Sequence, residues 1–302
     1  MFPPREFRGV ISLKAKLVSF LVIFILFSQP APAKKADSLS SELSALLGNR
    51  RGCIILLEAK SGRILATAHP ETATRQAFPP GSLFKVVTAL ALLKDGKTDP
   101  KEEVICRDSF RVGSRTLTCM YPGGHGKVNL TSALARSCCI YFYTQGLKLP
   151  PESLLNEARL LGLGQSPGRL LPPRNPNQMA DLLVGEGPGI LVTPMQMAEV
   201  IRKIASAQGG PDKKSADIIK RAMRECVRRG TGKKAALGVS VSVAGKTGTA
   251  QDLRFPGRTL GWFGGFAPYP DPKVIVLVFV EGGNGADSAA SLAAKALQTY
   301  FK

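Results

Sequence analysis

The segment PPGSLFK, at residues 79–85, contains the pattern on which the fold prediction depends: a serine followed three residues later by a lysine. Pro-Pro-Gly breaks any preceding element, and the apolar stretch that follows, up to Gly96, predicts a helix beginning near Ser82. Side chains three apart share a helix face, so Ser82 and Lys85 can lie close together. A serine hydroxyl is a weak nucleophile that needs an adjacent base, and a buried lysine can be that base. Alone, the pair is a weak signal, because most such pairs are a helix cap and a solvated lysine.

Two later segments carry similar short patterns. VAGKTGTAQ, at residues 243–251, places Lys246 near the end of a predicted strand between two glycines. Glycine at these positions lets another backbone approach closely, and an open strand edge can pair with an extended peptide. The same sequence also fits a strand that simply ends in a turn. ARSCCIYFY, at residues 135–143, places Ser137 before two adjacent cysteines, which are poor disulfide partners for each other.

The remaining pattern predicts an α+β fold: an antiparallel sheet packed with helices, together with a helical subdomain. An early hairpin at 52–69 and three late strands at 239–251, 259–269 and 274–280 are expected to share the sheet. Residues 97–130 are expected to form a loop insert or a small hairpin. Helical patterns occupy 79–96, 130–147, a segment beginning at Thr193-Pro194, 215–230 and 287–301.

The composition indicates a folded protein with a basic surface. The chain has 302 residues, 44% hydrophobic and 21% charged, which suits one large domain or two small ones. Its net charge of +19 favours anionic surroundings, or is simply an alkaline isoelectric point without a specific partner. Because no lysine-rich tail or aromatic RNA motif accompanies that charge, nucleic acid is not expected as a partner.

The N-terminus predicts export. Residues 1–33 combine a basic start, the apolar run 17–27 and a small-residue site that ends at Ala33. The segment is either a cleaved signal peptide or a retained membrane anchor, because two lysines follow the site directly. Both alternatives place the rest of the chain outside the cytoplasmic membrane, in the periplasm or cell envelope. Residues 34–50 are expected to be a lead-in to a domain at 51–302.

Together and in this order, PPGSLFK, ARSCC and VAGKTGTAQ resemble the three active-site motifs of the penicillin-binding transpeptidase superfamily. Those motifs are Ser-x-x-Lys, Ser-x-Asn (or Asp) and Lys-Thr-Gly. The stretches 185–210, 223–235 and 261–276 are similar to other segments of that family, and the similarity extends over roughly residues 50–300. The class B domains of the elongation type are the most similar.

The resemblance implies a role for each matching position. Catalytic positions correspond to Ser82, Lys85, Ser137 and Lys246, and substrate-binding positions to Cys139, Thr247, Gly248 and Thr249. Ser82 would be the acylated nucleophile, Lys85 its base, and Ser137 a proton relay to the leaving group. Lys246 would hold the substrate carboxylate with the two threonines, and the amides of Ser82 and Thr249 would form the oxyanion hole. No cofactor is implied for catalysis.

The implied activity is that of a peptidoglycan D,D-transpeptidase or D,D-carboxypeptidase. Acylation of Ser82 by the D-Ala-D-Ala end of a stem peptide would release D-Ala, and an amine or water would then resolve the acyl-enzyme. β-Lactams would trap Ser82, and a glycan polymerase in the membrane is the implied partner. Two alternatives stay open: a class D-like β-lactamase or β-lactam sensor, and a non-catalytic scaffold. The scaffold is suggested by Cys139, which stands where the family usually has Asn or Asp.

The cysteines suggest a metal site. Cys106, Cys119, His125 and Cys138 follow the spacing C-x12-C-x5-H-x12-C. Three thiolates and an imidazole would suit a structural zinc ion, and some elongation-type relatives bind a metal at this place through Asp, His and Cys. A disulfide between the first two cysteines, which export permits, and free thiols are the alternatives. Cys138 is expected to point toward the insert, away from the cleft; Cys53 and Cys226 are expected in the core, and His69 has no identifiable partner.

Overall fold

The computed structural model describes residues 33–96 and 98–302. The predicted export segment, residues 1–33, lies outside this range except for its last residue. Among the described helices, none is long and apolar enough to cross a membrane.

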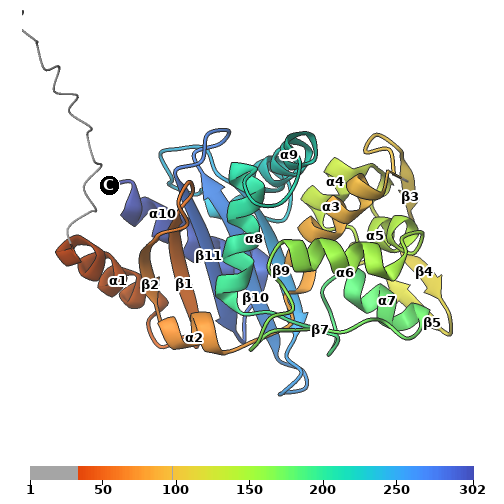
Figure 1. Ribbon diagram of the computed structural model, residues 1–302, viewed down its shortest axis with the longest axis horizontal. Helices are drawn as coiled ribbons and strands as arrows, with labels where there is room; N and C mark the ends of the chain where they lie inside the picture. Colours follow the sequence, from red (N-terminus) through yellow and green to blue (C-terminus); the bar gives the residue numbers. More distant parts are fainter. Residues whose placement is uncertain (1–32, 97) are drawn as a thin grey trace, which may run out of the picture. The chain divides into compact units, whose positions relative to one another are not determined.

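One five-stranded antiparallel sheet organises the domain, in the order β2-β1-β11-β10-β9 (Figure 1). Its strands are β1 (Gly52–Glu58), β2 (Ile64–Ala68), β9 (Ala244–Gln251), β10 (Thr259–Ala267) and β11 (Val274–Glu281). The early hairpin and the three late strands therefore share a sheet, which confirms the predicted α+β fold. The central strand β11 is buried along its whole length, as its unbroken apolar sequence predicts.

Helices cover both faces of the sheet. Ile54 and Leu56 of β1 pack with α1 (Ala33–Leu47) and α10 (Ala290–Tyr300) in one apolar cluster. The alternate residues Ile55 and Leu57 belong to the second cluster, on the side crossed by α8 (Pro194–Ser206), as expected from the two-residue period of a strand (Figure 1). α2 (Pro70–Arg75) follows β2.

Two predicted boundaries differ from the structure. The sequence indicates only a lead-in at residues 34–50, but α1 packs into the domain because its apolar face buries Leu43 and Leu47 completely. The strand predicted to start at 239 begins at Ala244. Val239 and Val241 lie in a loop, and both pack against the core. Their two-residue spacing resembles that of a strand, but they do not belong to a strand of the sheet.

The helical subdomain lies beside β9, at the right of Figure 1. It contains α3 (Lys85–Asp95), α4 (Leu130–Arg136), α5 (Cys139–Gly146), α6 (Pro151–Leu160) and α7 (Pro176–Leu183), and α9 (Lys213–Arg229) packs between it and the sheet. The insert forms two small antiparallel pairs, β3 (Val104–Cys106) with β6 (Gly126–Val128) and β4 (Ser109–Val112) with β5 (Arg115–Thr118). A third pair joins β7 (Arg169–Leu170) to β8 (Ile190–Leu191).

The single helical pattern predicted at 130–147 is interrupted in the structure. α4 ends at Ser137, whose φ of 59° and ψ of 34° are left-handed, and α5 restarts at Cys139. The amide of Cys138 donates to Ala133 O at 2.8 Å, which closes the end of α4. The uninterrupted prediction is therefore wrong at this point, because a serine is an uncommon residue for a left-handed helix end.

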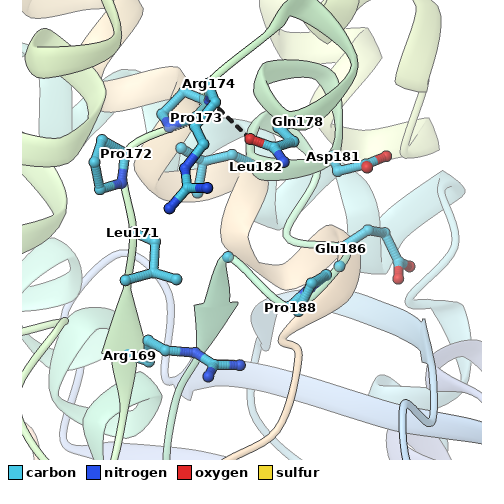
Figure 2. A pocket seen from close by; sticks show the side chains of 12 residues that line it. Arg169, Leu171, Pro172, Pro173, Arg174, Gln178, Asp181, Leu182, Glu186 and Pro188 are labelled. Carbon is cyan, nitrogen blue, oxygen red and sulfur yellow. Dashed lines mark hydrogen bonds between the residues drawn. The ribbon is translucent and has the colours of Figure 1, made fainter.

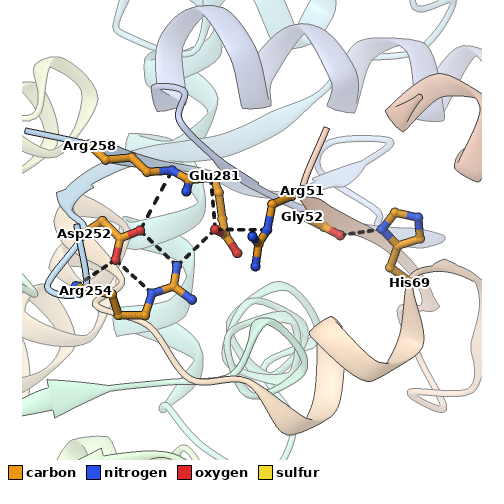
Figure 3. A network of polar contacts seen from close by, with 7 residues as sticks. All are labelled: Arg51, Gly52, His69, Asp252, Arg254, Arg258 and Glu281. Carbon is orange, nitrogen blue, oxygen red and sulfur yellow. Dashed lines mark hydrogen bonds and ion pairs between the residues drawn. The ribbon is translucent and has the colours of Figure 1, made fainter. Parts of the chain in front are cut away.

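A network of ion pairs ties the β9–β10 connection to the end of β11 (Figure 3). Glu281, whose side chain is only 2% exposed, lies 3.1 Å from Arg254, 3.0 Å from Arg258 and 3.5 Å from Arg51. Asp252 accepts two hydrogen bonds of 2.9 Å from the Arg254 guanidinium, which lowers the pKa of its carboxyl group. Two buried carboxylates are thus neutralised by three arginines, and the network fixes the far end of the edge strand.

The residues predicted to have structural roles lie in ordinary packing positions. Cys53 in β1 and Cys226 in α9 are both fully buried, as expected. His69 has a partner that the sequence did not identify: its Nδ1 lies 3.0 Å from the carbonyl oxygen of Gly52 (Figure 3).

Candidate active site

Ser82 lies in a short 3-10 turn, η1 (Gly81–Phe84), that continues directly into α3. Gly81 has a φ of +54°, and its amide donates to Gly185 O at 2.8 Å. A Cβ on Gly81 would lie only 2.4 Å from Thr249 O, so this position requires glycine both for its dihedral angle and for space. The turn that carries Ser82 is therefore fixed between the Gly185 loop and β9.

Strands β9 and β10 of the sheet also pack against the turn that carries Ser82. The indole Nε1 of Trp262, a fully buried residue of β10, donates to Pro79 O at 3.0 Å. In β9, a Cβ on Gly248 would lie 2.6 Å from Pro80 O and 2.8 Å from Leu83 N. The sequence predicts that a glycine here lets a backbone approach, and the backbone that approaches is the protein's own Ser82 turn.

β9 is an edge strand. It pairs with β10 on one side, and no further strand of the described residues pairs with its other side. The strand also lies against the turn of Ser82, because a Cβ on Gly81 would meet Thr249 O at 2.4 Å. An extended peptide can add to such an edge by main-chain hydrogen bonds.

Ser137 connects two buried lysines. Lys246 Nζ donates to Ser137 Oγ at 3.0 Å and to Thr247 O at 2.7 Å. Lys85 Nζ donates to Ser137 O at 2.9 Å and to Cys139 Sγ at 3.0 Å. Both lysine side chains are completely buried. Lys85 and Lys246 lie 52 and 109 positions away from Ser137 in the sequence, and both contact it in the structure. The three motifs therefore meet at one place.

Burial and mutual repulsion shape the electrostatics of the pair. Burial above all, together with the nearby charge of Lys85, lowers the pKa of Lys246 to about 8, against the opposing effects of Cys226 and Cys139. The ring of Phe142 lies 5.5 Å from Lys85 Nζ, close enough for a cation–π contact. Among the described residues, no hydrogen bond joins Ser82 Oγ to Lys85, so these two groups are not yet engaged in the free protein.

The two adjacent cysteines point in different directions. Cys139 is partly exposed and directs its thiol to Lys85, whereas Cys138 is fully buried and belongs to a cluster with Cys106 and His125. The two thiols point in different directions because the left-handed backbone at Ser137 ends the helix immediately before the two cysteines. The expectation that Cys138 faces the insert agrees with this geometry.

The ligand atoms of Cys106, His125 and Cys138 all lie within 4.8 Å of one another. Cys119 joins the group, since its Sγ lies 3.1 Å from His125 Nδ1 and 3.7 Å from Cys106 Sγ. A disulfide bond measures about 2.0 Å, so the alternative pairing of Cys106 with Cys119 is not formed here, and all six cysteines are free.

Two residues near the motifs have no role in the sequence-based prediction. Thr231 Oγ1 lies 2.6 Å from Thr247 Oγ1, shortly after α9, within the stretch 223–235 that is similar to the family. Glu186 Oε2 accepts from Gln251 N at 3.4 Å, at the end of β9, and burial raises the pKa of its carboxyl group to about 7. Thr249, a predicted site residue, accepts from Gly285 N at 3.0 Å through its Oγ1.

A serine at the start of a buried helix, two lysines joined by a second serine, and an adjacent open sheet edge define a class of serine–lysine domain with an α+β fold. The chain belongs to the family described as the penicillin binding protein transpeptidase domain, whose model matches residues 52–299. The predicted family is therefore confirmed.

Individual relatives agree with this family. The chain is 27% identical to stage V sporulation protein D of Bacillus subtilis over 253 residues, which cover 69% of this chain and 39% of that protein. It is 25% identical over 386 residues to the peptidoglycan D,D-transpeptidase MrdA of Haemophilus influenzae, covering 93% of this chain and 58% of that protein. The chain therefore matches less than two thirds of the length of either relative.

The fold has a close counterpart among solved structures. The crystal structure of Pseudomonas aeruginosa PBP2 in complex with WCK 5153 superposes with a TM-score of 0.79 at 25% sequence identity. The match covers 87% of this chain and 77% of that one. The sheet, the flanking helices and the helical subdomain are therefore those of a transpeptidase domain.

Proposed function

We propose that this protein is a peptidoglycan D,D-transpeptidase that acts through an acyl-enzyme on Ser82. The observation that carries the proposal is the meeting of Lys85 and Lys246 at Ser137, beside the turn of Ser82 and the open edge of β9. The relatives named as D,D-transpeptidases support it. The substrate is the D-Ala-D-Ala end of a stem peptide, bound as an added strand along β9.

The contacts of Lys85 suit it as the base for Ser82. Lys85 acts as the base in its neutral form, and a neutral amine has two N–H donors and one lone pair. The two donors are used by Ser137 O and Cys139 Sγ, so the lone pair is left for the serine proton. As Ser82 Oγ attacks the carbonyl carbon of the D-Ala–D-Ala bond, its proton passes to Lys85 Nζ, and the amides of Ser82 and Thr249 receive the negative oxygen.

Ser137 suits the second half of this step. Because its Oγ accepts a hydrogen bond from Lys246, its own proton is free to be donated to the leaving nitrogen. The C–N bond breaks, D-Ala leaves as a neutral amine, and Lys85 returns a proton to Ser137. An amine from a second stem peptide then attacks the ester, which forms the cross-link and regenerates Ser82. Water in place of the amine gives the carboxypeptidase reaction.

The terminal carboxylate of the substrate is held by the third motif. The Lys246 ammonium supplies the charge, and the hydroxyls of Thr247 and Thr249 supply hydrogen bonds. Thr249 Oγ1 already accepts from Gly285 N, so its proton is directed elsewhere and is available to a carboxylate. β-Lactams carry a carboxylate at a similar distance from their reactive carbonyl, and they therefore acylate the same serine.

Labelling with fluorescent penicillin tests the proposal. The wild type and Ser61→Ala, whose serine is exposed in the β1–β2 turn, are expected to be labelled on Ser82, and Ser82→Ala is expected to stay unlabelled. An unlabelled wild type would contradict the proposal and favour a non-catalytic scaffold. Rapid loss of the label, with fast turnover of nitrocefin, would identify a β-lactamase. Mass spectrometry of the products from a D-Ala-D-Ala peptide separates cross-linking from hydrolysis.

The cysteine cluster fits a structural zinc ion. In a tetrahedral site with Zn–S of about 2.3 Å and Zn–N of about 2.0 Å, sulfur atoms lie roughly 3.8 Å apart and sulfur and nitrogen about 3.5 Å apart. The Sγ atoms of Cys106 and Cys119 lie 3.7 Å apart, and Cys106 Sγ lies 3.5 Å from His125 Nδ1. Cys119 Sγ lies closer to that nitrogen, at 3.1 Å, and the ligand atoms within 4.8 Å of one another are those of Cys106, His125 and Cys138, so Cys119 would have to move to complete a tetrahedral site. We propose that Cys106, Cys119, His125 and Cys138 hold zinc, which would tie the insert to the back of the Ser137 motif.

We also propose that the domain acts outside the cytoplasmic membrane and works with a glycan polymerase in the membrane. The export pattern of residues 1–33 supports the location. A cross-linking enzyme needs newly made glycan strands, which supports the partner. Protease accessibility of the domain in intact spheroplasts tests the location, since a cytoplasmic domain would be protected.

A further inference from the structure

A pocket lies next to the candidate active site and has no part in the chemistry above. It has a volume of about 250 Å³ and is formed by β7, the segment that follows it, α7 and the loop 186–189 (Figure 2). Its walls are largely apolar, with Leu171, Leu182 and Pro188 around the open space. Such a pocket can take an aliphatic side chain of a bound peptide.

Two arginines give this pocket its charge. Figure 2 shows Arg174 and Arg169 reaching the pocket from opposite sides of the opening. Within residues 33–96 and 98–302, no carboxylate forms an ion pair with either guanidinium. The nearby acid Asp181 already has a partner, because Arg115 donates to both of its oxygens at 3.0 Å. The pocket therefore has two positive charges free for a ligand.

The pocket is connected to the turn of Ser82 by a short segment. Gly185 O accepts from Gly81 N, the residue before Ser82, and Glu186 Oε2 accepts from Gln251 N at the end of β9. The loop 186–189 continues from there into the pocket wall. A peptide that pairs with β9, with its terminal carboxylate at Lys246 and Thr247 and its preceding residues toward Gln251, is therefore directed toward the pocket.

We propose that Arg169 and Arg174 form a specificity pocket for a side-chain carboxylate of the donor peptide, carried by the residue directly before its D-Ala-D-Ala end. Arginine binds a carboxylate through paired hydrogen bonds, and the apolar walls accept the chain that carries it. Glu186 and Asp181 are the other titratable groups at the pocket. Glu186 points away from the two guanidiniums in Figure 2, and burial shifts its pKa upward, which reduces its competition for them. The inference rests on the proposed function.

Two synthetic donors test the pocket. Both end in D-Ala-thiolactate, and they differ only in a side-chain carboxylate or its carboxamide at the residue before D-Ala. The ratio of their kcat/KM values, measured by thiol release, is expected to favour the carboxylate at least about tenfold in the wild type. Arg169→Gln/Arg174→Gln should bring the ratio close to one, and Arg169→Lys/Arg174→Lys should keep part of the preference. Arg159→Gln, in an exposed ion pair on α6, is the matched control and should keep all of it.

The two failures can be distinguished. If Ser82 is labelled by penicillin but the wild type does not prefer the carboxylate donor, or if Arg169→Gln/Arg174→Gln keeps that preference, the proposed specificity pocket is wrong. An unlabelled wild type overturns the proposed function first. Because each variant is compared with itself on the carboxamide donor, a general loss of activity does not change the ratio, and thermal melting shows whether the variant is folded.

Discussion

Lys85 Nζ and Cys139 Sγ lie 3.0 Å apart at the candidate active site, and Cys139 stands where the family usually places an amide or a carboxylate. The thiol accepts a hydrogen bond from the lysine there, so the contact is kept although the residue has changed. A sulfur atom is a weaker acceptor than an amide oxygen. The cysteine at position 139 therefore weakens the hydrogen bond that positions Lys85 but does not remove it.

Replacement of Cys139 tests how much this contact contributes. Cys139→Ala removes the acceptor and is expected to slow acylation of Ser82 by penicillin roughly 2- to 10-fold, the usual effect of losing one hydrogen bond between neutral groups. Cys139→Asn restores an oxygen and should acylate at least as fast as the wild type. Stopped-flow acylation kinetics check both. Equal rates for all three proteins would show that the thiol does not support Lys85.

The pKa of Lys246 predicts a pH dependence of substrate binding. Its folded pKa of about 8 is below the ordinary value of 10.5. Above pH 8 the folded protein loses the ammonium that holds the carboxylate, so KM for a D-Ala-D-Ala donor is expected to rise while kcat changes less. Steady-state kinetics from pH 6.5 to 9.5 check this. A flat KM across that range would contradict the role of Lys246 as the anchor.

The same shift predicts a change in stability. Between pH 8 and 10.5 the unfolded chain holds a proton on Lys246 that the folded protein has lost, so this residue makes the free energy of unfolding rise with pH across that window. Below pH 8 both states are protonated and the penalty of burial is constant. Urea unfolding at pH 7.5 and 9.5 should show this rise in the wild type relative to Lys246→Gln. An identical pH dependence in the two proteins would be inconsistent with the shift.

Thr231 is expected to orient the carboxylate site through Thr247. Thr231→Val keeps the shape of the side chain and removes the 2.6 Å hydroxyl contact, so Thr247 loses its fixed orientation. A loss of about 1 kcal/mol in binding is expected, which raises KM roughly fivefold. Thr74→Val, which removes an exposed hydroxyl bond on α2, is the control and should leave KM unchanged. A purely structural role would instead lower thermal stability at an unchanged KM.

Gly81 is expected to be required for acylation. Gly81→Ala introduces a Cβ 2.4 Å from Thr249 O at a positive φ, and should both destabilise the domain and prevent labelling of Ser82. Gly96→Ala is a matched control, because Gly96 has a φ of +71° but nothing lies within 4 Å of its Cβ. It should lose only about 1–2 kcal/mol of stability from backbone strain and keep its labelling. Normal labelling of Gly81→Ala would show that the turn tolerates displacement.

The metal proposal separates the two adjacent cysteines. Cys138→Ser is expected to lose zinc and to lower the melting temperature, because the insert is then released from the Ser137 motif. Cys139→Asn should keep its zinc and change only acylation. Metal analysis of the purified proteins by mass spectrometry checks both, with Cys53→Ala as a control for loss of a buried thiol elsewhere. Full zinc content in Cys138→Ser would refute this division of roles.

Patterns of local sequence predicted the sheet and most helices well. The unbroken apolar run of β11 correctly indicated burial of both its faces, and Thr193 with Pro194 correctly marked the start of α8. The break at Ser137 was missed, because a left-handed serine has no sequence signal. It is stabilised by distant partners: Lys246 binds its Oγ and Lys85 binds its carbonyl oxygen.

The motif residues could be selected only through their resemblance to a family, since their contacts are long-range. Thr231 shows the limit of this method. It follows a recognisable helix stop, but its contact with Thr247 depends on how the end of α9 packs against β9. The same holds for Arg169 and Arg174, which are five residues apart and resemble ordinary solvated arginines until the pocket between them is seen.

The open edge of β9 limits how resistance to an inhibitor can arise. The C=O groups of an edge strand are the same whichever side chains the strand carries, and only proline removes an N–H, so most point mutations leave these groups in place. A β-lactam that pairs with this edge uses the contacts that the natural peptide also needs. Escape variants are therefore expected at Cys139 and the arginine pocket, where side chains can distinguish the drug from the cell-wall peptide.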